Sequence, residues 1–365
     1  MKKFLVLIII CLFLCSCAMS EQVSKNVTTD SKFGQSTKLT LSMVGDAIIY
    51  SSIYKDALDE GKYDFCKMIE SIKPIAESSD LLYYNQESII GGDNLGFYGF
   101  PKFNTPANFA KTMISYGFNL VSRANEHALD QGEKGLLNSC NFWNKYSEVT
   151  TGGSFCTSDE QESLKIFTKN GFKIAFLNYT DVPWEETLPK EYYLNVYSED
   201  RAKEDLDKIA DETDLKIVAI HWGEEGSNEP TERQKGIAKF LAEVGVDVII
   251  GTHPSVIQPV EMIGNTIVFY SLGNFLSGQD KGDDYNKRIG LLGQIDFIKV
   301  EYGSEKKVVL DKLYGELLFI DSKDGRDYRV IPFSDMDDSI LKGFKDKKIK
   351  YESVVKKYIS NIEMR

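Results

Sequence analysis

Three histidines are the only imidazoles in this 365-residue chain, and each lies at or just beyond the end of an apolar run typical of a β-strand. They are His127, His221 and His253. In an open α/β sheet, ligands bind at the carboxyl ends of the strands. We therefore expect the three imidazoles to meet there, although any one of them alone would be interpreted more simply as a packed core or surface histidine.

Two further apolar runs end on oxygen ligands in the same way. The run 39–45 ends at Asp46, and the run 81–84 ends beside Asn85 and Glu87. Imidazoles and carboxylates together suit a divalent ion such as Mn, Zn or Fe. Two such ions that share a carboxylate would lower the pKa of water and clamp a phosphoryl group, and Asp46 and Glu87 are the carboxylates placed to be shared. The sequence thus predicts a site for one or two divalent ions.

Three neighbouring features have two interpretations each. Asp130 is placed either to orient the imidazole of His127 or to favour the start of a helix through the helix dipole. Asn274 follows the run 266–271 on a turn, where it either binds substrate or a ligand or only shapes the turn. The segment 91–104 is rich in glycine and aromatic residues, and it is either a substrate-facing loop or a packed surface loop.

The elements that must position these residues alternate along the chain. From residue 38 to about residue 300, short β-rich runs alternate with helical stretches, which predicts a layered α/β domain. We expect strands at 39–45, 80–85, 118–123, 172–178, 215–221, 246–250, 266–271, 290–300 and 307–318, the last two antiparallel. We expect helices at 64–76, 106–116, 132–146, 202–209, 232–244 and 338–359. No phosphate-binding glycine loop or serine nucleophile elbow occurs at a strand–helix junction, which excludes those nucleotide-binding and serine-hydrolase classes.

The N-terminus predicts export. Lys2 and Lys3 precede an apolar stretch that is too short to span a membrane, as in a secretory signal. The sequence Leu14-Cys15-Ser16-Cys17 resembles a bacterial lipobox, which implies a diacylglycerol group on Cys17; an ordinary signal peptide with a nearby cysteine is the alternative. We expect a signal at 1–17, a flexible tether at 18–37, the main domain at 38–320 and a charged extension at 321–365.

Charge and cysteine content restrict the partners. The formal net charge is −12, and we expect no basic stripe to interrupt it, which argues against nucleic acid. Beyond the signal only Cys66, Cys140 and Cys156 remain, with no metal-binding spacing. We expect buried free thiols, with one disulfide as the alternative in an exported protein.

Several segments together resemble the bacterial poly-γ-glutamate capsule synthesis proteins, the CapA-like family. The matching segments are Val44-Gly45-Asp46, Asn85-Gln86-Glu87, residues 124–132, His221-Trp222-Gly223, residues 245–261 and residues 270–275. The last two are the most specific. The resemblance covers about residues 38–300 and implies a calcineurin-like metallophosphoesterase fold, a sandwich with a β-sheet core flanked by helices. With the residue types, it predicts catalysis by His127 and Asp130, metal binding by Asp46, Glu87, Glu126, His221 and His253, and substrate binding by Asn85, Asn125 and Asn274.

The chain departs from the family pattern at two positions. The family usually reads Asn-Asn-His where this chain has Asn125-Glu126-His127, and His-Pro-His where it has His253-Pro254-Ser255. The carboxylate of Glu126 can still bind a metal, whereas Ser255 removes an imidazole from one of the two metal positions. One ion, two ions or a site without catalysis therefore stay open.

The resemblance implies a membrane-anchored extracytoplasmic protein that acts with other capsule-synthesis membrane proteins on an anionic polymer such as poly-γ-glutamate. Metal-dependent hydrolysis is the first expectation, either of a phosphoester or of a γ-glutamyl amide. The alternative is a lipoprotein that binds or assembles the polymer in the same cleft without turnover. The fold by itself does not decide between them.

Overall fold

The structure, a computed structural model, describes residues 35–182, 188–210, 212–279, 285–302 and 305–365. The predicted signal, Cys17 and the tether up to residue 34 lie outside the described residues. The chain forms two compact units, of which the larger comprises residues 37–298 and 308–365 and the smaller residues 1–36 and 299–307. The candidate site lies in the larger unit.

Two large β-sheets organise this unit. The strands of the first sheet are β1 (Gln35–Ile48), β4 (Leu81–Gln86), β5 (Leu120–Ser122), β6 (Thr150–Gly152), β13 (Asn274–Ser277), β14 (Ile289–Tyr302), β15 (Glu305–Lys323), β16 (Arg326–Pro332) and β17 (Glu363–Met364). Their order is β16-β15-β14-β1-β4-β5-β6, with β13 beside β1 and β17 beside β15. The neighbours β1, β4, β5 and β6 run parallel, as does β13 beside β1.

The second sheet has a parallel centre and antiparallel edges. Its strands are β7 (Ile166–Lys169), β8 (Phe172–Thr180), β9 (Leu215–His221), β10 (Val248–Thr252), β11 (Val260–Ile263) and β12 (Thr266–Phe269). They are ordered β11-β12-β10-β9-β8-β7, with only β7 and β11 antiparallel to their neighbours. A separate small hairpin joins β2 (Leu58–Asp59) and β3 (Lys62–Tyr63).

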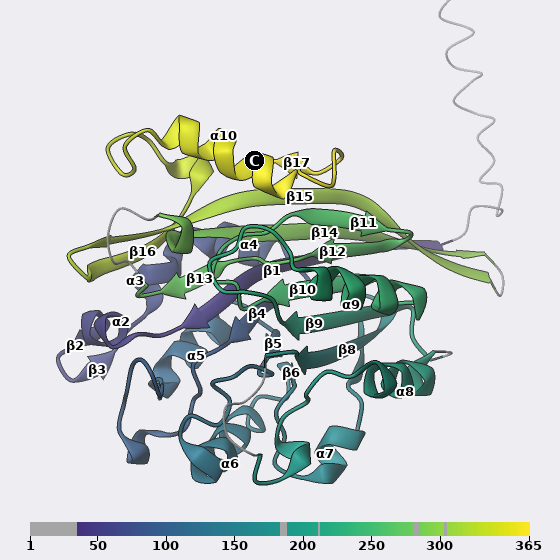
Figure 1. Cartoon of the computed structure of the whole chain (residues 1–365), viewed down its shortest axis with the longest axis horizontal. Coiled ribbons are helices and arrows are strands. Elements are labelled where there is room, and N and C mark those ends of the chain that lie inside the picture. Colours follow the sequence, from purple (N-terminus) through teal and green to yellow (C-terminus); the bar gives the residue numbers. More distant parts are fainter. Residues whose placement is uncertain (1–34, 183–187, 211, 280–284, 303–304) are drawn as a thin grey trace, which may run out of the picture. The chain divides into compact units, whose positions relative to one another are not determined.

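Helices cover the sheets. They are α2 (Ser51–Asp56), α3 (Cys66–Ile69), α4 (Lys73–Glu77), α5 (Ala107–Ser115), α6 (Gly132–Trp143), α7 (Ser158–Glu162), α8 (Glu199–Ile209), α9 (Glu232–Glu243) and α10 (Phe344–Val355), with 3₁₀ turns η1 (Glu70–Ile72), η2 (Asp93–Leu95), η3 (Glu191–Tyr193), η4 (Asn286–Arg288) and η5 (Phe333–Asp335). Figure 1 shows α8 and α9 beside the second sheet and α10 beyond β15.

The central strands are apolar on both faces because both faces are buried. In β4, Leu81 and Tyr83 point into a core shared with Phe176 of the second sheet, while Leu82 and Tyr84 pack with the helices on the other side. This alternation follows from the two-residue period of a strand. The resulting order of layers, helices on sheet on sheet on helices, is the layered α/β sandwich that the sequence predicts.

The predicted strands and helices are present with shifted ends, except that the helix expected at 64–76 is divided into α3, η1 and α4. Two further expectations change. Residues 35–37, assigned to the tether, form the start of β1 as the structure defines it. Residues 321–365, assigned to an extension, contain β16, α10 and β17, and Tyr351 and Val355 of α10 are buried in the main core. The C-terminal part was hard to assign because its apolar residues find their partners only on the distant strands β14 and β15.

The expectation of buried free thiols is wrong for Cys140 and Cys156, which are paired, and it is half right for Cys66, which is free but not buried. Cys140 in α6 and Cys156 form a disulfide across a sequence separation of 16 residues, and Cys66 is free and exposed. The sequence left this open because the spacing of the two cysteines does not reveal that the loop after α6 returns to the helix.

Removing this disulfide is expected to destabilise the chain by about 3 kcal/mol, because a cross-link over a loop of this length restricts the unfolded chain. The measurement is urea unfolding of the double variant Cys140→Ala/Cys156→Ala beside the native chain. Reductant should lower the midpoint of the native chain and leave that of the variant unchanged. Cys66→Ala is the matched control; an equal loss of stability in the control would contradict the prediction.

Candidate metal centre

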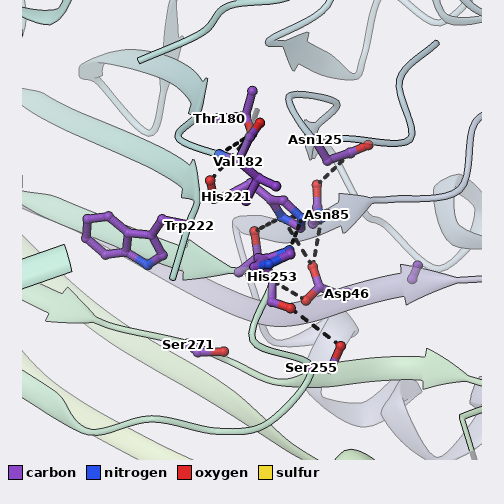
Figure 2. A network of polar contacts seen from close by, with 12 residues as sticks. Asp46, Asn85, Asn125, Thr180, Val182, His221, Trp222, His253, Ser255 and Ser271 are labelled. Carbon is purple, nitrogen blue, oxygen red and sulfur yellow. Dashed lines mark hydrogen bonds and ion pairs between the residues drawn. The ribbon is translucent and has the colours of Figure 1, made fainter. Parts of the chain in front are cut away.

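The carboxyl ends of parallel strands from both sheets bring the predicted polar residues together. Asp46 in β1 lies opposite Asn85 of β4 on one side and opposite Asn274 of β13 on the other. His221 is the last residue of β9, and His253 comes directly after β10. Figure 2 shows Asp46, Asn85, His221 and His253 pointing toward one another.

Glycine permits the close approach of β1 and β13. The backbone N–H of Asp46 donates to the carbonyl of Gly273 over 3.0 Å. A Cβ atom on Gly45 would lie 1.8 Å from the same oxygen, which no side chain can tolerate. Gly45 therefore allows the fully buried carboxylate of Asp46 to lie beside β13. No residue larger than glycine fits at position 45.

The imidazole of His221 is fixed by contacts on both ring nitrogens. Nδ1 lies 2.8 Å from Oγ1 of Thr252, and Nε2 lies 2.7 Å from Oε2 of Glu126. A hydroxyl that holds one nitrogen orients the other, which is the usual arrangement of a metal-binding histidine. Thr252 was missed by the sequence analysis, although its position directly before His253 at a strand end offered a signal.

His253 approaches the same carboxylate with a strained backbone. Its φ of 98° lies in the region that favours glycine, and its N–H donates to Oδ2 of Asp46 over 3.1 Å. Its Nδ1 lies 3.0 Å from Oε1 of Glu126 and 3.2 Å from Nε2 of His221. A strained residue that is held by its neighbours is typical of functional sites.

Glu126 belongs to two groups of possible metal ligands, whereas Asp46 and Glu87 are the carboxylates that the sequence predicts to be shared. Its ligand atoms group with those of His221 and His253, and also with those of Glu87 and His127, within 4.8 Å in each group. Asp46 belongs to neither of these two groups, and its two oxygens accept hydrogen bonds from Asn85 and His253. The residue that departs from the family pattern thus lies at the centre of the site.

The amides predicted to bind substrate donate hydrogen bonds within the buried network, whereas Oδ1 of Asn274 has no hydrogen-bond partner among the described residues. Asn85 Nδ2 donates to Oδ1 of Asp46 over 2.7 Å, and Asn125 Nδ2 donates to the carbonyl of Gln86 over 3.1 Å. Both residues are fully buried. Asn274 begins β13 rather than following a strand, and its Nδ2 donates to Gln279 and to the carbonyl of Lys287.

His127 and Asp130 form a pair at the edge of the cluster. Nδ1 of His127 lies 2.8 Å from Oδ2 of Asp130, and this oxygen also accepts the N–H of Phe103 over 2.7 Å. Burial opposes protonation of the imidazole, but the hydrogen bond and charge of Asp130 raise the pKa of His127 above its ordinary value. The contact supports the interpretation that Asp130 orients the imidazole of His127. It leaves Nε2 of His127 as the nitrogen that could transfer a proton or bind a ligand.

Ser255 occupies the position where the family usually has a second histidine. Its φ of 60° is also in the left-handed region, and its hydroxyl donates to the carbonyl of His253 over 3.4 Å. The hydroxyl of Ser255 therefore stabilises the local turn.

Three carboxyl groups lie at the candidate site, of which Asp46 and Glu87 are buried and Glu126 is half-buried. Burial raises the pKa of Asp46, and burial with the neighbouring carboxylates raises the pKa of Glu87 well above its ordinary value. Burial alone would also raise the pKa of Glu126, but the charge and contacts of the two imidazoles bring it well below the ordinary value. Glu126 is therefore the carboxyl group most readily ionised.

The donor set fits a divalent cation. Oε2 of Glu126 is buried and, despite its contact with His221, lacks a hydrogen bond within the described residues. In the described part of the chain no lysine or arginine pairs with Asp46, Glu87 or Glu126, so positive charge comes only from imidazoles. One carboxylate and two imidazoles are ligands that Zn, Mn and Fe accept.

A cleft of about 670 Å³ adjoins this cluster, lined by Tyr50, Ser51, Phe100, Glu225, Gly278, Gln279 and Lys287. Gln279 connects it to the cluster, because its Oε1 accepts from Asn274 over 3.0 Å. The rings of Tyr50 and Phe103 meet at 5.2 Å, and those of Phe103 and His127 at 4.8 Å.

The segment 91–104 combines both interpretations that the sequence left open. Phe100 is 70% exposed and lines the cleft, whereas Phe103 is fully buried beside His127. Gln279 and Lys287 were missed, since nothing in the sequence near them indicates a cleft.

The residues of the candidate site lie within the part of the chain that is similar to known proteins. Residues 40–279 match the family described as bacterial capsule synthesis protein PGA_cap. The PGA biosynthesis protein CapA of Bacillus subtilis (strain 168) is 28% identical over 245 residues, 66% of this chain and 64% of that protein. The capsule biosynthesis protein CapA of Bacillus anthracis is 27% identical over 263 residues, 68% of this chain and 62% of that protein. The match thus spans less than two thirds of the length of either relative.

Among solved structures, a proposed 5′-nucleotidase of Staphylococcus aureus is similar with a TM-score of 0.48 and 14% identity, over 86% of this chain and 58% of that one.

Proposed function

The chain belongs to the bacterial capsule synthesis protein family PGA_cap, and from this premise we propose that it acts on an anionic capsular polymer such as poly-γ-glutamate by metal-dependent hydrolysis. The observation that carries the proposal is the position of Glu126 between the imidazoles of His221 and His253, beside an open cleft. The names of the two CapA relatives support the choice of polymer.

Glu126, His221 and His253 would hold one divalent ion. When bound, such an ion polarises a carbonyl or phosphoryl oxygen and lowers the pKa of water. Thr252 keeps Nδ1 of His221 occupied, so Nε2 is the nitrogen left for the ion. Asp46 stays outside the donor group and holds the backbone of His253 in its strained conformation.

His127 is the group proposed to transfer a proton. Asp130 occupies its Nδ1, so Nε2 is the atom that exchanges a proton with the leaving group or with water. The same nitrogen would be needed to place a second ion between Glu87 and Glu126. One imidazole nitrogen cannot perform both tasks at once, and we therefore favour a single ion with His127 as the acid.

A second candidate function is binding or assembly of the polymer without turnover. The observation that favours it is Ser255, which replaces an imidazole of the family pattern and directs its hydroxyl to the backbone. In that case the same cleft would hold the polymer, and the ion would only order the strand ends.

The proposed location is the extracytoplasmic face of the cell membrane, with an anchor at Cys17 and contact with other capsule-synthesis membrane proteins. The disulfide between Cys140 and Cys156 supports an oxidising compartment. Over the described ranges, no helix has the length and hydropathy needed to cross a bilayer.

Turnover tests the proposal directly. The full chain, stripped of metal and then loaded with Mn²⁺ or Zn²⁺, is expected to cleave either a γ-glutamyl oligomer or a generic phosphodiester at least about tenfold faster than the stripped chain. The product identifies the bond. His221→Ala should abolish the gain. A loaded chain that binds poly-γ-glutamate but turns over neither substrate would establish the binding function instead.

A further inference from the structure

Lysines concentrate on the C-terminal helix of a chain that is otherwise acidic. Residues 342–357 contain seven lysines against Asp346 and Glu352, whereas the formal net charge of the chain is −12. The expectation that no basic stripe interrupts the acidic surface is therefore wrong. The net charge of the whole chain conceals this stripe, because these lysines are a small fraction of all its charged residues.

Burial of one side of α10 forces these lysines outward. Tyr351, Val355 and Ile359, spaced four residues apart, are buried in the core together with Leu317 of β15. The lysines on the opposite side of the helix and just before and after it are exposed, and Figure 1 shows α10 as the outermost layer over β15. We call the exposed set of Lys342, Lys345, Lys350 and Lys356 the basic face.

The basic face keeps most of its charge uncompensated. Within the described residues, neither Lys342 nor Lys345 forms an ion pair, and Lys356 is 3.9 Å from Glu352. Lys350 lies 4.8 Å from the ring centre of Tyr351. Lys357, by contrast, pairs with Glu229 and is not included. The four lysines have one weak pairing among them, although Asp338 lies at the start of the helix, and together they attract an anion long enough to contact several of them.

Contacts connect α10 with the cleft beside the candidate metal centre. Tyr351 Oη donates to Oδ1 of Asn286 over 2.6 Å, and Lys347 lies 5.2 Å from the ring centre of Tyr285. Lys287, which follows Asn286 in the chain, lines the cleft, and its carbonyl accepts a hydrogen bond from Asn274. The 3₁₀ turn η4 thus connects the buried and half-buried side of α10 with the cleft.

We propose that the basic face is a docking surface for a carboxylate polymer, which binds there beyond the segment held in the cleft. The proposal rests on the proposed function for the identity of the polymer. A polymer with one carboxylate per residue can contact several exposed lysines of the basic face, and each contact adds charge attraction that salt weakens.

A membrane surface is the less suitable partner for this helix. A helix that lies in a lipid interface needs a broad apolar face toward the lipid. The apolar residues of α10 are used in the protein core, and Ile349, 69% exposed, is the one large apolar side chain exposed on the described helix. The charge is thus available without the apolar area that would insert.

The test compares charge-matched variants of the full chain. The first is Lys342→Gln/Lys345→Gln/Lys350→Gln/Lys356→Gln, and the control is Lys62→Gln/Lys67→Gln/Lys111→Gln/Lys145→Gln, whose lysines are exposed but dispersed over other elements. Binding of long poly-γ-glutamate is measured at low and high salt, with γ-glutamyl trimer turnover and binding to vesicles containing one quarter phosphatidylglycerol alongside. Ile349→Ser is measured in the same way.

The basic-face variant is expected to bind the long polymer at least about tenfold more weakly at low salt, with a smaller dependence on salt, while the control and Ile349→Ser change by less than about twofold. Trimer turnover should be the same in all four proteins, because none of the replaced side chains lines the cleft. Unchanged polymer binding in the basic-face variant would overturn the proposed docking surface. The proposal would also be overturned if the native chain bound the vesicles and both the basic-face variant and Ile349→Ser did not. Absence of trimer turnover in the native chain would count against hydrolysis and leave the polymer measurement decisive for docking.

Discussion

Replacing Glu126 with alanine is expected to remove the divalent ion and all metal-dependent turnover. Glu126 is common to both groups of potential ligands, and its two oxygens contact His221 and His253 separately. No other described carboxylate lies in the group with both imidazoles. Since loss of supporting groups around a metal already costs about 10- to 100-fold in affinity, loss of the shared ligand should cost about 100-fold or more.

The measurement is metal content by elemental analysis together with affinity by titration of Mn²⁺ and Zn²⁺. Glu224→Ala is the matched control, because Glu224 is exposed in the loop after His221 and belongs to neither ligand group. Glu126→Asn restores the family residue and keeps a neutral oxygen, so it should retain weak binding. Equal metal content in Glu126→Ala and the native chain would show that this carboxylate is not a ligand.

Replacing Gly45 with alanine is expected to cost on the order of 4 kcal/mol or more of stability, the range of the most severe single substitutions. The added Cβ would lie 1.8 Å from the carbonyl oxygen of Gly273, which is backbone and cannot rotate away. The contact between β1 and β13 must open, which also displaces Asp46 from Asn274. Folding and the candidate site should therefore fail together.

Gly236→Ala provides a control with the opposite sign. Gly236 is exposed within α9, and a Cβ there meets no atom within 4 Å. Alanine should stabilise that helix by about 1 kcal/mol because it favours the helical conformation more than glycine does. Urea unfolding of both variants and the native chain measures the difference. A Gly45→Ala midpoint within error of the native one would refute the close approach of the two strands.

Much of the site could be predicted from local sequence. Asp46, His221 and His253 follow apolar runs, and an apolar run fixes both the strand and the end at which its polar neighbour emerges. The same reasoning predicted the layers, because continuous apolar runs, such as 217–220 in β9 and 248–250 in β10, require cover on both faces.

Pairings between distant segments could not be predicted in this way. The disulfide of Cys140 and Cys156, the packing of α10 on β15 and the alignment of Asp46 with Asn274 each join residues whose contact depends on how the loops return. The role of Glu126 belongs to this class. From the sequence it is a substitution beside His127, and only the meeting of β9 and β10 places its oxygens between two imidazoles.

The sequence by itself determined which residues carry chemistry and at which strand ends they emerge, because side-chain type and hydrophobic period are local properties. The tertiary structure decided which carboxylate lies between the imidazoles, which amides join the buried network and where the lysines of α10 face. Those outcomes depend on distances between strands of two different sheets, and such distances are set by the packing of the whole core rather than by any one segment.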